Sequence, residues 1–426
     1  MRLALPFGSG SVDVTLPDDA VVLEPEPEPA LAEPERAVLA ACAAPLAALP
    51  LRQLARGRHS ACIAVPDVTR PVVGPWVLPA LRRELAAAGV ERLEVVIATG
   101  THRGATADEI LQLLGREAAE ELPVRSHDAQ DGEHDLVGET TAGVPVWIDR
   151  GYVRADLKLA LGVVEPHLMA GYSGGAKTLC PGLARLDTVR GVHRPALARG
   201  RVGPGIVVGN PFRDEVRQAA GLVGADFTVQ CAVTAGGAPA EVAAGDLGAT
   251  MARVTAWVER RARLRAETEF DVVVTTAGGP SLDRTLYQCA KGWIAALGVV
   301  RPGGDVVLVA EMGEGIGSVE FEALLSQARD LAEMDRELDT PGFFRRDQWM
   351  AQHVFQARAR ARLHAVTRLP RARLAALGID AHPSLEAALA RLLPPAGAHR
   401  LLVLPRGPFC VATVGDRLVT LSGAAA

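Results

Sequence analysis

The sequence predicts an α/β protein with two α/β domains, mostly parallel sheets, and an active site between the domains at the carboxyl ends of the strands. Short apolar runs typical of buried strands alternate with helical segments, and this alternation favours parallel sheets. The length of 426 residues is sufficient for two domains that each bury a core. Polar side chains directly follow several predicted strands, which is where such folds bind ligands.

The first domain is predicted to cover residues 1–268. It opens with a hairpin over residues 2–16, where apolar residues alternate around a Gly-Ser-Gly turn, and an acidic, proline-rich linker follows (Glu24–Arg36). The remaining predicted elements are a helix (Ala37–Ala48), the strand CIAVP, a helix around Val77–Ala88, a strand (Leu93–Gly100), a helix through Leu114, a strand (Leu157–Val164), a strand and loop into a helix (Gly205–Val216), a strand (Phe227–Thr234) and a helix (Met251–Glu267).

The second domain is predicted to cover residues 269–426. A strand in FDVVVTTAGGP (Phe270–Pro280) leads to a helix that contains LYQCAKGWIAAL. Strands in PGGDVVLVA and LLVLP follow, and the final strands could return to the first domain.

Composition indicates a soluble globular chain, with 49% apolar and 22% charged residues. The formal net charge of -5 suggests no basic face for nucleic acid. The first residues, MRLALPFGSGSVDVTLP, lack the pattern of a signal peptide, and no apolar run approaches the ~20 residues that span a bilayer. The six cysteines include no CxxC pair, so we expect reduced thiols in a cytoplasmic protein without a membrane partner.

A glycine-rich stretch after the strand of Leu157–Val164 is the strongest candidate for a site. Gly174 and Gly175 provide backbone freedom for a tight connection, and Ser173 and Thr178 are candidate caps for a helix that begins near Lys177. That lysine could bind phosphate, form a covalent adduct or pair with a carboxylate. The string GGAKT is not a phosphate-binding P-loop, because Ala176 stands where that motif requires glycine.

Histidines follow two of the predicted strands, His102 in ATGTHRG and His167 in EPHLMAG. A single histidine has a structural role more often than a catalytic one, but two at strand ends could act as acid and base on opposite sides of a substrate. His193 follows Lys177 by sixteen residues, and neutral imidazole is a common ligand for zinc, copper, iron and nickel.

Two further groups of polar residues suit a substrate carboxylate. In DVTRP, Arg70 is a bidentate partner for carboxylate or phosphate, and Asp67 could orient it. Tyr287, Gln288 and Lys291 lie at helical spacing on one face, where an amphipathic face without a ligand is the alternative explanation.

Taken together, these motifs resemble the nickel-pincer lactate racemase family. The central motif stands as EPHLMAGYSGGAKTLCPG (Glu165–Gly182), with His193 further on. DVTRP, ATGTHRG, YQCAK and the Gln348-Trp349 pair match in the same order, and five separated motifs in register are far more specific than one glycine pattern.

The resemblance implies a role for each residue. Lys177 would carry a pyridinium-3,5-bisthiocarboxylic acid mononucleotide through a thioamide, His193 would ligate its nickel, and His102 and His167 would be the acid–base pair. Contacts to the cofactor would come from the remaining glycine-loop and strand-end residues: Asp67, Thr69, Ser173, Gly174 and Gly175. Contacts to the substrate would come from Arg70, Tyr287, Gln288, Lys291 and Trp349.

The implied reaction is inversion of C2 of a 2-hydroxy acid by reversible hydride transfer to the cofactor, through a 2-keto acid. Enzymes that make the cofactor would then act upstream of this protein. Two other functions stay open from the residues: a zinc-dependent hydrolase with His102, His167 and His193 as ligands, and a non-catalytic carrier of nickel or of the pincer nucleotide. A carrier would not need the His102–His167 pair. An epimerase of a larger sugar acid would differ only in substrate.

Overall fold

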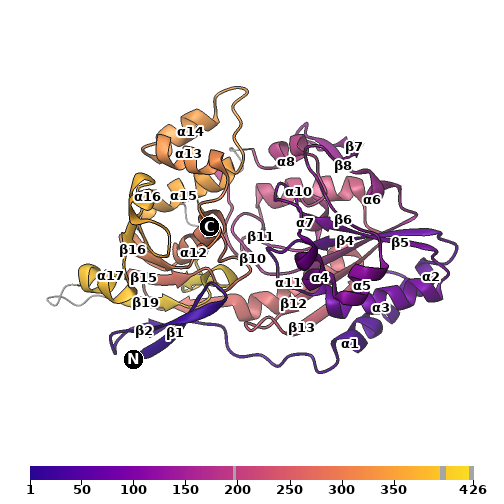
Figure 1. Ribbon diagram of the computed structural model, residues 1–426, viewed down its shortest axis with the longest axis horizontal. Helices are drawn as coiled ribbons and strands as arrows, with labels where there is room; N and C mark the ends of the chain where they lie inside the picture. The colour runs from indigo at the N-terminus through magenta and orange to yellow at the C-terminus, as the bar shows by residue number, and fades with distance from the viewer. Residues whose placement is uncertain (195–197, 394–399, 422–426) are drawn as a thin grey trace.

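The computed structural model describes residues 1–194, 198–393 and 400–421, and it confirms the predicted fold class. Two α/β lobes lie side by side, each built on a six-stranded sheet (Figure 1). Every pairing in the two sheets is parallel except that of β12 with β13.

The first lobe is built on the sheet whose strands are, in spatial order, β13 (Pro239–Gly245), β12 (Phe227–Val233), β9 (Leu157–Val163), β4 (Ser60–Pro66), β5 (Arg92–Ala98) and β6 (Val124–Ser126). Helices cover both faces. One face packs against α1 (Pro34–Ala43), α2 (Leu51–Leu54), α3 (Gly74–Ala87), α4 (Ala107–Leu114) and α5 (Arg116–Glu121). The other packs against α6 (Arg150–Arg154), α7 (Ala176–Leu179), α8 (Leu186–Val192) and α10 (Pro211–Val223), while α11 (Leu247–Ala262) lies against β12 and β13.

The second lobe is built on the sheet β18 (Asp380–His382), β17 (Arg362–Val366), β16 (Val300–Val309), β15 (Phe270–Thr276), β19 (Leu401–Leu404) and β3 (Val21–Val22). One face carries α12 (Leu286–Ala296), α13 (Val319–Gln327), α14 (Leu331–Leu338) and α15 (Gln348–Arg360). The other carries α17 (Leu385–Leu392) and the predicted hairpin of β1 (Arg2–Phe7) and β2 (Gly10–Thr15), and α16 (Arg371–Ala376) lies beside β18.

Chain segments cross between the two lobes. The opening hairpin, expected with the first domain, packs against the second sheet, and β3 pairs there with β19 (Figure 1). Near the other end of the chain, β20 (Val411–Val414) pairs with β14 (Arg263–Ala266), which directly follows α11. The domain boundary at residue 268 stays a prediction.

Two predicted elements differ from our expectation: one strand does not form, and one helix is shorter. No strand forms at Gly205–Gly209, because Gly205 and Gly209 have φ of 76° and 67° and the Gly205 N–H donates to the carbonyl of Gly171. The helix predicted to reach Glu267 ends at Ala262, since the next four residues pair with β20 instead.

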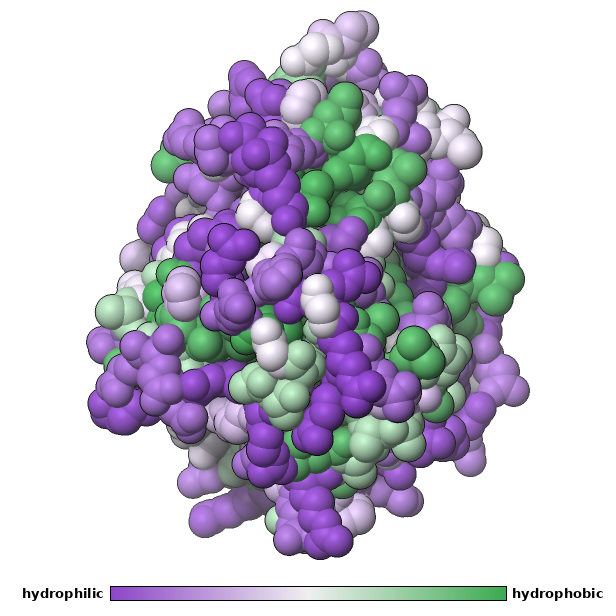
Figure 2. All heavy atoms as spheres, turned by 90° about the vertical axis from the view of Figure 1, so that its right-hand side faces the viewer, coloured by the Kyte–Doolittle hydropathy of each residue, from purple (hydrophilic) through white to green (hydrophobic). Residues whose placement is uncertain are grey.

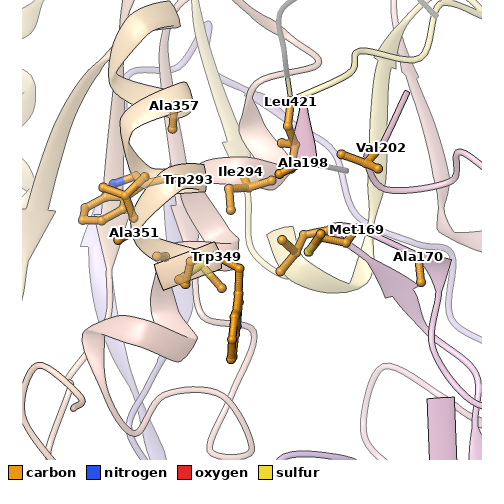
Figure 3. Close-up of a cluster of buried hydrophobic side chains, with 14 of the residues drawn as sticks. Met169, Ala170, Ala198, Val202, Trp293, Ile294, Trp349, Ala351, Ala357 and Leu421 are labelled. Carbon is orange, nitrogen blue, oxygen red and sulfur yellow. The ribbon is translucent and has the colours of Figure 1, made fainter. Parts of the chain in front are cut away.

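The largest apolar core extends across both lobes. Figure 3 labels Trp293, Ile294 and Trp349 on helices of the second lobe, together with Met169 and Val202 from the first lobe, and all five belong to this cluster. The lobes therefore share a buried contact beside the region where the predicted site residues converge.

The surface agrees with the composition. Figure 2 shows the first lobe from the right of Figure 1, where hydrophilic side chains predominate and apolar ones form patches between them. Across the described ranges, no helix has the length and apolar character required to cross a membrane. The six cysteines are all unpaired and buried, as expected for reduced thiols.

Candidate active site

A cavity of about 140 Å³ lies between the lobes, where the loops after β4, β5 and β9 meet the first turns of α12 and α15. The structure brings thirteen of the fourteen predicted site residues to its wall: Asp67, Thr69, Arg70, His102, His167, Ser173, Gly174, Lys177, His193, Tyr287, Gln288, Lys291 and Trp349. Gly175 is the exception and directly follows Gly174, which does line the cavity. The roles implied by the family resemblance remain predictions for each of them.

Asp67 orients His102 rather than Arg70. Its Oδ2 lies 2.6 Å from Nδ1 of His102, and its Oδ1 accepts hydrogen bonds from the Thr69 hydroxyl (2.6 Å) and backbone N–H (3.2 Å). Burial alone would raise the pKa of Asp67, but His102 and the Thr69 hydroxyl together lower it. An ionised Asp67 assigns the ring proton to Nδ1 of His102, so Nε2 retains its lone pair and can act as a base.

His167 has the opposite arrangement. Its Nδ1 accepts hydrogen bonds from the backbone N–H groups of Met169 and Ala170, both at 3.1 Å. Burial, with the charges of Lys177 and Arg70, holds the pKa of His167 well below its usual value, so the ring is neutral. Its single proton is therefore assigned to Nε2, which makes His167 a hydrogen-bond donor at that atom.

The glycine loop places Lys177 in the cavity. Gly174 and Gly175 have φ of 77° and 54°, in the left-handed region that favours glycine, and the Gly175 N–H donates to Gln230 Oε1 at 2.8 Å. Burial lowers the pKa of Lys177 to about 7, and the nearby charge of Arg70 adds to this effect. Near neutral pH a large share of Lys177 is therefore an uncharged amine, the form that acts as a nucleophile.

The predicted helix caps are wrong. Helix α7 has Gly175 as its N-cap and no side-chain cap. The Ser173 hydroxyl instead donates to the carbonyl of Val163 and accepts from the N–H of Glu165, and the Thr178 hydroxyl donates to Leu161. Both hydroxyls thus tie the loop to β9 and to the residues that follow it.

His193 is positioned by the end of α8 and by aromatic neighbours. Its Nδ1 lies 3.0 Å from the carbonyl of Val189, which assigns the proton to Nδ1 and leaves the Nε2 lone pair free. Its ring lies 4.8 Å from Phe212 and 4.7 Å from Trp349, and Lys177 Nζ lies 5.2 Å from the Phe212 ring. Burial and the charge of Lys177 lower the pKa of His193 to about 3.

The arrangement of Lys177 and His193 fits the predicted cofactor. A thioamide link needs an uncharged amine, and nickel accepts a neutral imidazole nitrogen. Both groups line one cavity and both contact Phe212, so a ligand attached to Lys177 would lie close to His193.

The second lobe contributes three residues of α12 and the start of α15. Lys291 donates to Gln288 Oε1, and burial, with the charge of Arg70, lowers the pKa of Lys291 to about 7. Trp349 Nε1 donates to the Tyr287 hydroxyl at 3.0 Å, and the Tyr287 ring meets His102 edge-on at 6.4 Å. The cavity is therefore complete only when both lobes are present.

Sequence reasoning missed three supporting residues. Phe212 packs against Lys177 and His193, Gln230 holds the glycine loop, and Glu165 lies 3.6 Å from Arg70. A polar residue within the buried strand of Phe227–Val233 was a usable signal for Gln230. The sequence carries no comparable signal for Phe212.

The zinc alternative finds no ligand set. Within residues 1–194, 198–393 and 400–421, no three histidine, cysteine, aspartate or glutamate side chains form a metal-binding group. His102, His167 and His193 therefore do not form such a group.

Two family models match the chain: the lactate racemase N-terminal domain over residues 7–203 and the lactate racemase C-terminal domain over residues 265–408. The lactate racemase of Thermoanaerobacterium thermosaccharolyticum is 28% identical over 361 residues, which cover 82% of this chain and 84% of that protein. The lactate racemase of Lactiplantibacillus plantarum is 28% identical over 313 residues, covering 72% of this chain and 74% of that protein.

Solved structures agree with these matches. The lactate racemase apoprotein from Thermoanaerobacterium thermosaccharolyticum superposes with a TM-score of 0.88 at 26% identity, over 97% of this chain and 100% of that one. A structural-genomics protein from Thermotoga maritima superposes with a TM-score of 0.70 at 16% identity, over 92% and 100% respectively, and shows the shared fold alone.

Proposed function

Because this chain belongs to the lactate racemase family, we propose that it inverts C2 of a 2-hydroxy acid with a nickel-pincer nucleotide attached to Lys177. The observation that carries the proposal is the pair of histidines with opposite protonation at Nε2. His102 presents a lone pair to the cavity, and His167 presents an N–H.

This protonation state suits a racemisation step. The Nε2 atom of His102 can accept the hydroxyl proton of one enantiomer, and Asp67 stabilises the imidazolium that forms. The Nε2–H of His167 can donate a hydrogen bond to the substrate oxygen on its own side of the cavity. The proton that His102 accepted returns to that oxygen when the 2-keto acid is reduced on its other face, and His102 is then a neutral base again, so one cavity serves both enantiomers.

The cationic residues suit the carboxylate of the acid. Arg70 comes from the first lobe and Lys291 from the second, and both line the cavity. A guanidinium binds a carboxylate in bidentate fashion, and Gln288 adds an amide next to Lys291. The Arg70 contact would hold the acid while its C2 becomes planar, and Lys291 would offset negative charge that develops on the oxygen.

When bound, the nickel-pincer nucleotide supplies the acceptor and donor of the C2 hydride. Lys177 would attach it through its uncharged amine, and His193 would offer its Nε2 lone pair to the nickel. Trp349 and Phe212 both pack against the His193 ring, which limits its freedom to turn within the cavity wall.

Lactate is one candidate substrate, because the curated relatives are named lactate racemases. Larger or more polar 2-hydroxy acids are the other candidates. A panel of chiral 2-hydroxy acids, followed by chiral chromatography, identifies which of them loses optical purity.

The test compares four variants made together with the cofactor-making enzymes. We expect His102→Ala and His167→Ala to keep the covalent cofactor and lose racemisation by at least about 100-fold. Lys177→Ala should lose the cofactor itself, while His59→Ala, on the surface, should retain activity. Full racemisation by Lys177→Ala would overturn the proposal.

A further inference from the structure

Glu165 is a buried carboxylate beside the cavity that has no role in the proposed function. It follows β9 by two residues, and its backbone is fixed on both sides: its N–H donates to the Ser173 hydroxyl (2.9 Å), and its carbonyl accepts the Ser173 N–H (2.8 Å). The residue is only 6% exposed. The backbone of Glu165 is therefore fixed, and its side chain is buried.

The carboxylate lies behind Arg70 as seen from the active cavity. Arg70 lines the active cavity and Glu165 does not, while both residues line a second cavity of about 790 Å³ between the lobes and a small third cavity. Glu165 Oε2 lies 3.6 Å from an Arg70 guanidinium nitrogen and makes no hydrogen bond, although it is buried. Arg70 therefore stands between this carboxylate and the space where a substrate would lie.

The charged and titratable groups around Glu165 come from three other elements. In the third cavity they are Arg70 after β4, Lys291 on α12 and the neutral ring of His167 on β10 (Pro166–His167). The remaining wall of this third cavity is apolar, from Leu282, Ala295 and Phe409 among others, whereas the wider second cavity also has charged residues in its wall. Burial raises the pKa of Glu165 to about 7, against the opposing effects of Arg70 and Lys291. The groups whose charges favour the ionised form of Glu165 are thus Arg70 and Lys291, the two residues predicted to bind the substrate carboxylate.

We propose that Glu165 is a positioning residue for substrate recognition, which holds the Arg70 guanidinium toward the active cavity and balances the charge of Arg70 and Lys291. The inference rests on the proposed function, since it assumes that Arg70 receives the substrate carboxylate. The carboxylate of a 2-hydroxy acid does not change during racemisation. Loss of Glu165 should therefore weaken binding of the substrate and of the transition state to a similar extent. KM should then rise, and kcat should fall by a smaller factor.

The experiment measures binding and turnover separately. L-lactate is titrated calorimetrically into the cofactor-free full chain, and kcat and KM are measured on the cofactor-loaded enzyme with the acid that it racemises best. For Glu165→Gln we expect about a tenfold increase in both Kd and KM, with kcat within about threefold of wild type. Glu215→Gln is the matched control. Glu215 is also buried, and its Oε2 lies 3.0 Å from a guanidinium nitrogen of Arg194. Neither residue lines the active cavity.

A double-mutant cycle shows whether Glu165 acts through Arg70. In an Arg70→Met background, Glu165→Gln should change lactate affinity by less than about twofold, because no guanidinium remains to be held. If Glu165→Gln does not fold, Glu165→Asp retains the charge, and its Kd should lie between those of wild type and Arg70→Met.

Two results would overturn the inference: an unchanged lactate Kd in Glu165→Gln or Glu165→Asp, or full additivity in the cycle. Absence of lactate binding to the wild-type chain would count against it equally. The racemase assay judges the proposed function independently, because the calorimetric arm requires neither cofactor nor turnover.

Discussion

Asp67→Asn should prevent His102 from acting as a base, because Thr69 fixes the orientation of the side chain at position 67. In the wild type, Asp67 Oδ1 accepts two hydrogen bonds from Thr69, and Oδ2 faces His102 Nδ1 at 2.6 Å. An asparagine must keep its amide oxygen toward Thr69, so its NH₂ group faces the ring. The amide then donates to Nδ1, which moves the ring proton to Nε2 and removes the lone pair from the cavity.

The size of the effect follows from these contacts. A hydrogen bond to a charged group contributes about 1.5–3 kcal/mol, and this alone corresponds to roughly a 10- to 100-fold loss. The wrong tautomer adds to that loss, and the matching aspartate-to-asparagine change in a Ser-His-Asp triad costs about 10⁴-fold. We therefore expect kcat/KM to fall by about 10²–10⁴-fold. Because the equilibrium constant of racemisation is one, both directions must lose the same factor.

The assay follows optical rotation from each pure enantiomer, on enzyme whose covalent cofactor has been verified by mass. Asp149→Asn is the control, since that buried carboxylate lies 3.7 Å from a ring nitrogen of His127 outside the cavity. It should lower stability without a comparable loss of kcat/KM. A decrease of less than about threefold in Asp67→Asn would refute the assigned protonation of His102.

Three further predictions concern the cofactor loop. The rate at which acetic anhydride labels Lys177 should rise with pH and reach half of its maximum near pH 7. The protonated amine is unreactive, and burial lowers the pKa of Lys177 from the usual 10.5 to about 7. A half-maximal rate near pH 10 would contradict this prediction. Gly174→Ala should reduce the free energy of unfolding by about 1–3 kcal/mol, as measured by urea titration. The reason is that φ is 77° and the added Cβ would lie 2.9 Å from Gln230 Oε1 and 3.0 Å from Val164 Cγ2. An unchanged urea midpoint would contradict this prediction. His193→Ala should keep the covalent adduct but release nickel to a chelator faster than wild type, as followed by elemental analysis, and equal rates would argue against ligation by His193.

The sequence predicted the location of the site because the strand-end rule is geometric. Asp67, His102 and His167 lie in the loops after β4, β5 and β9, and parallel strands bring their carboxyl ends to one edge of a sheet. The type of residue at each position was therefore sufficient to predict a shared cavity. It was not sufficient to predict the partner of Asp67, which is His102 rather than Arg70.

Other features depend on tertiary contacts that a local pattern does not contain. The opposite tautomers of His102 and His167 are set by backbone N–H groups and a carboxylate whose orientations emerge only in the fold. The strand β3 has two residues, too few for any periodicity, and its pairing with β19 joins positions about 380 residues apart. The predicted strand at Gly205–Gly209 was wrong because two glycines there adopt positive φ.

Attachment of the cofactor at Lys177 is the central claim, and one measurement tests it most directly. The protein is produced together with the cofactor-making enzymes, and its intact mass and nickel content are determined. We predict a covalent mass increase that maps to the peptide containing Lys177, with about one nickel per chain, and no such increase in Lys177→Ala. An unmodified Lys177 in protein that nevertheless racemises a 2-hydroxy acid would contradict the account.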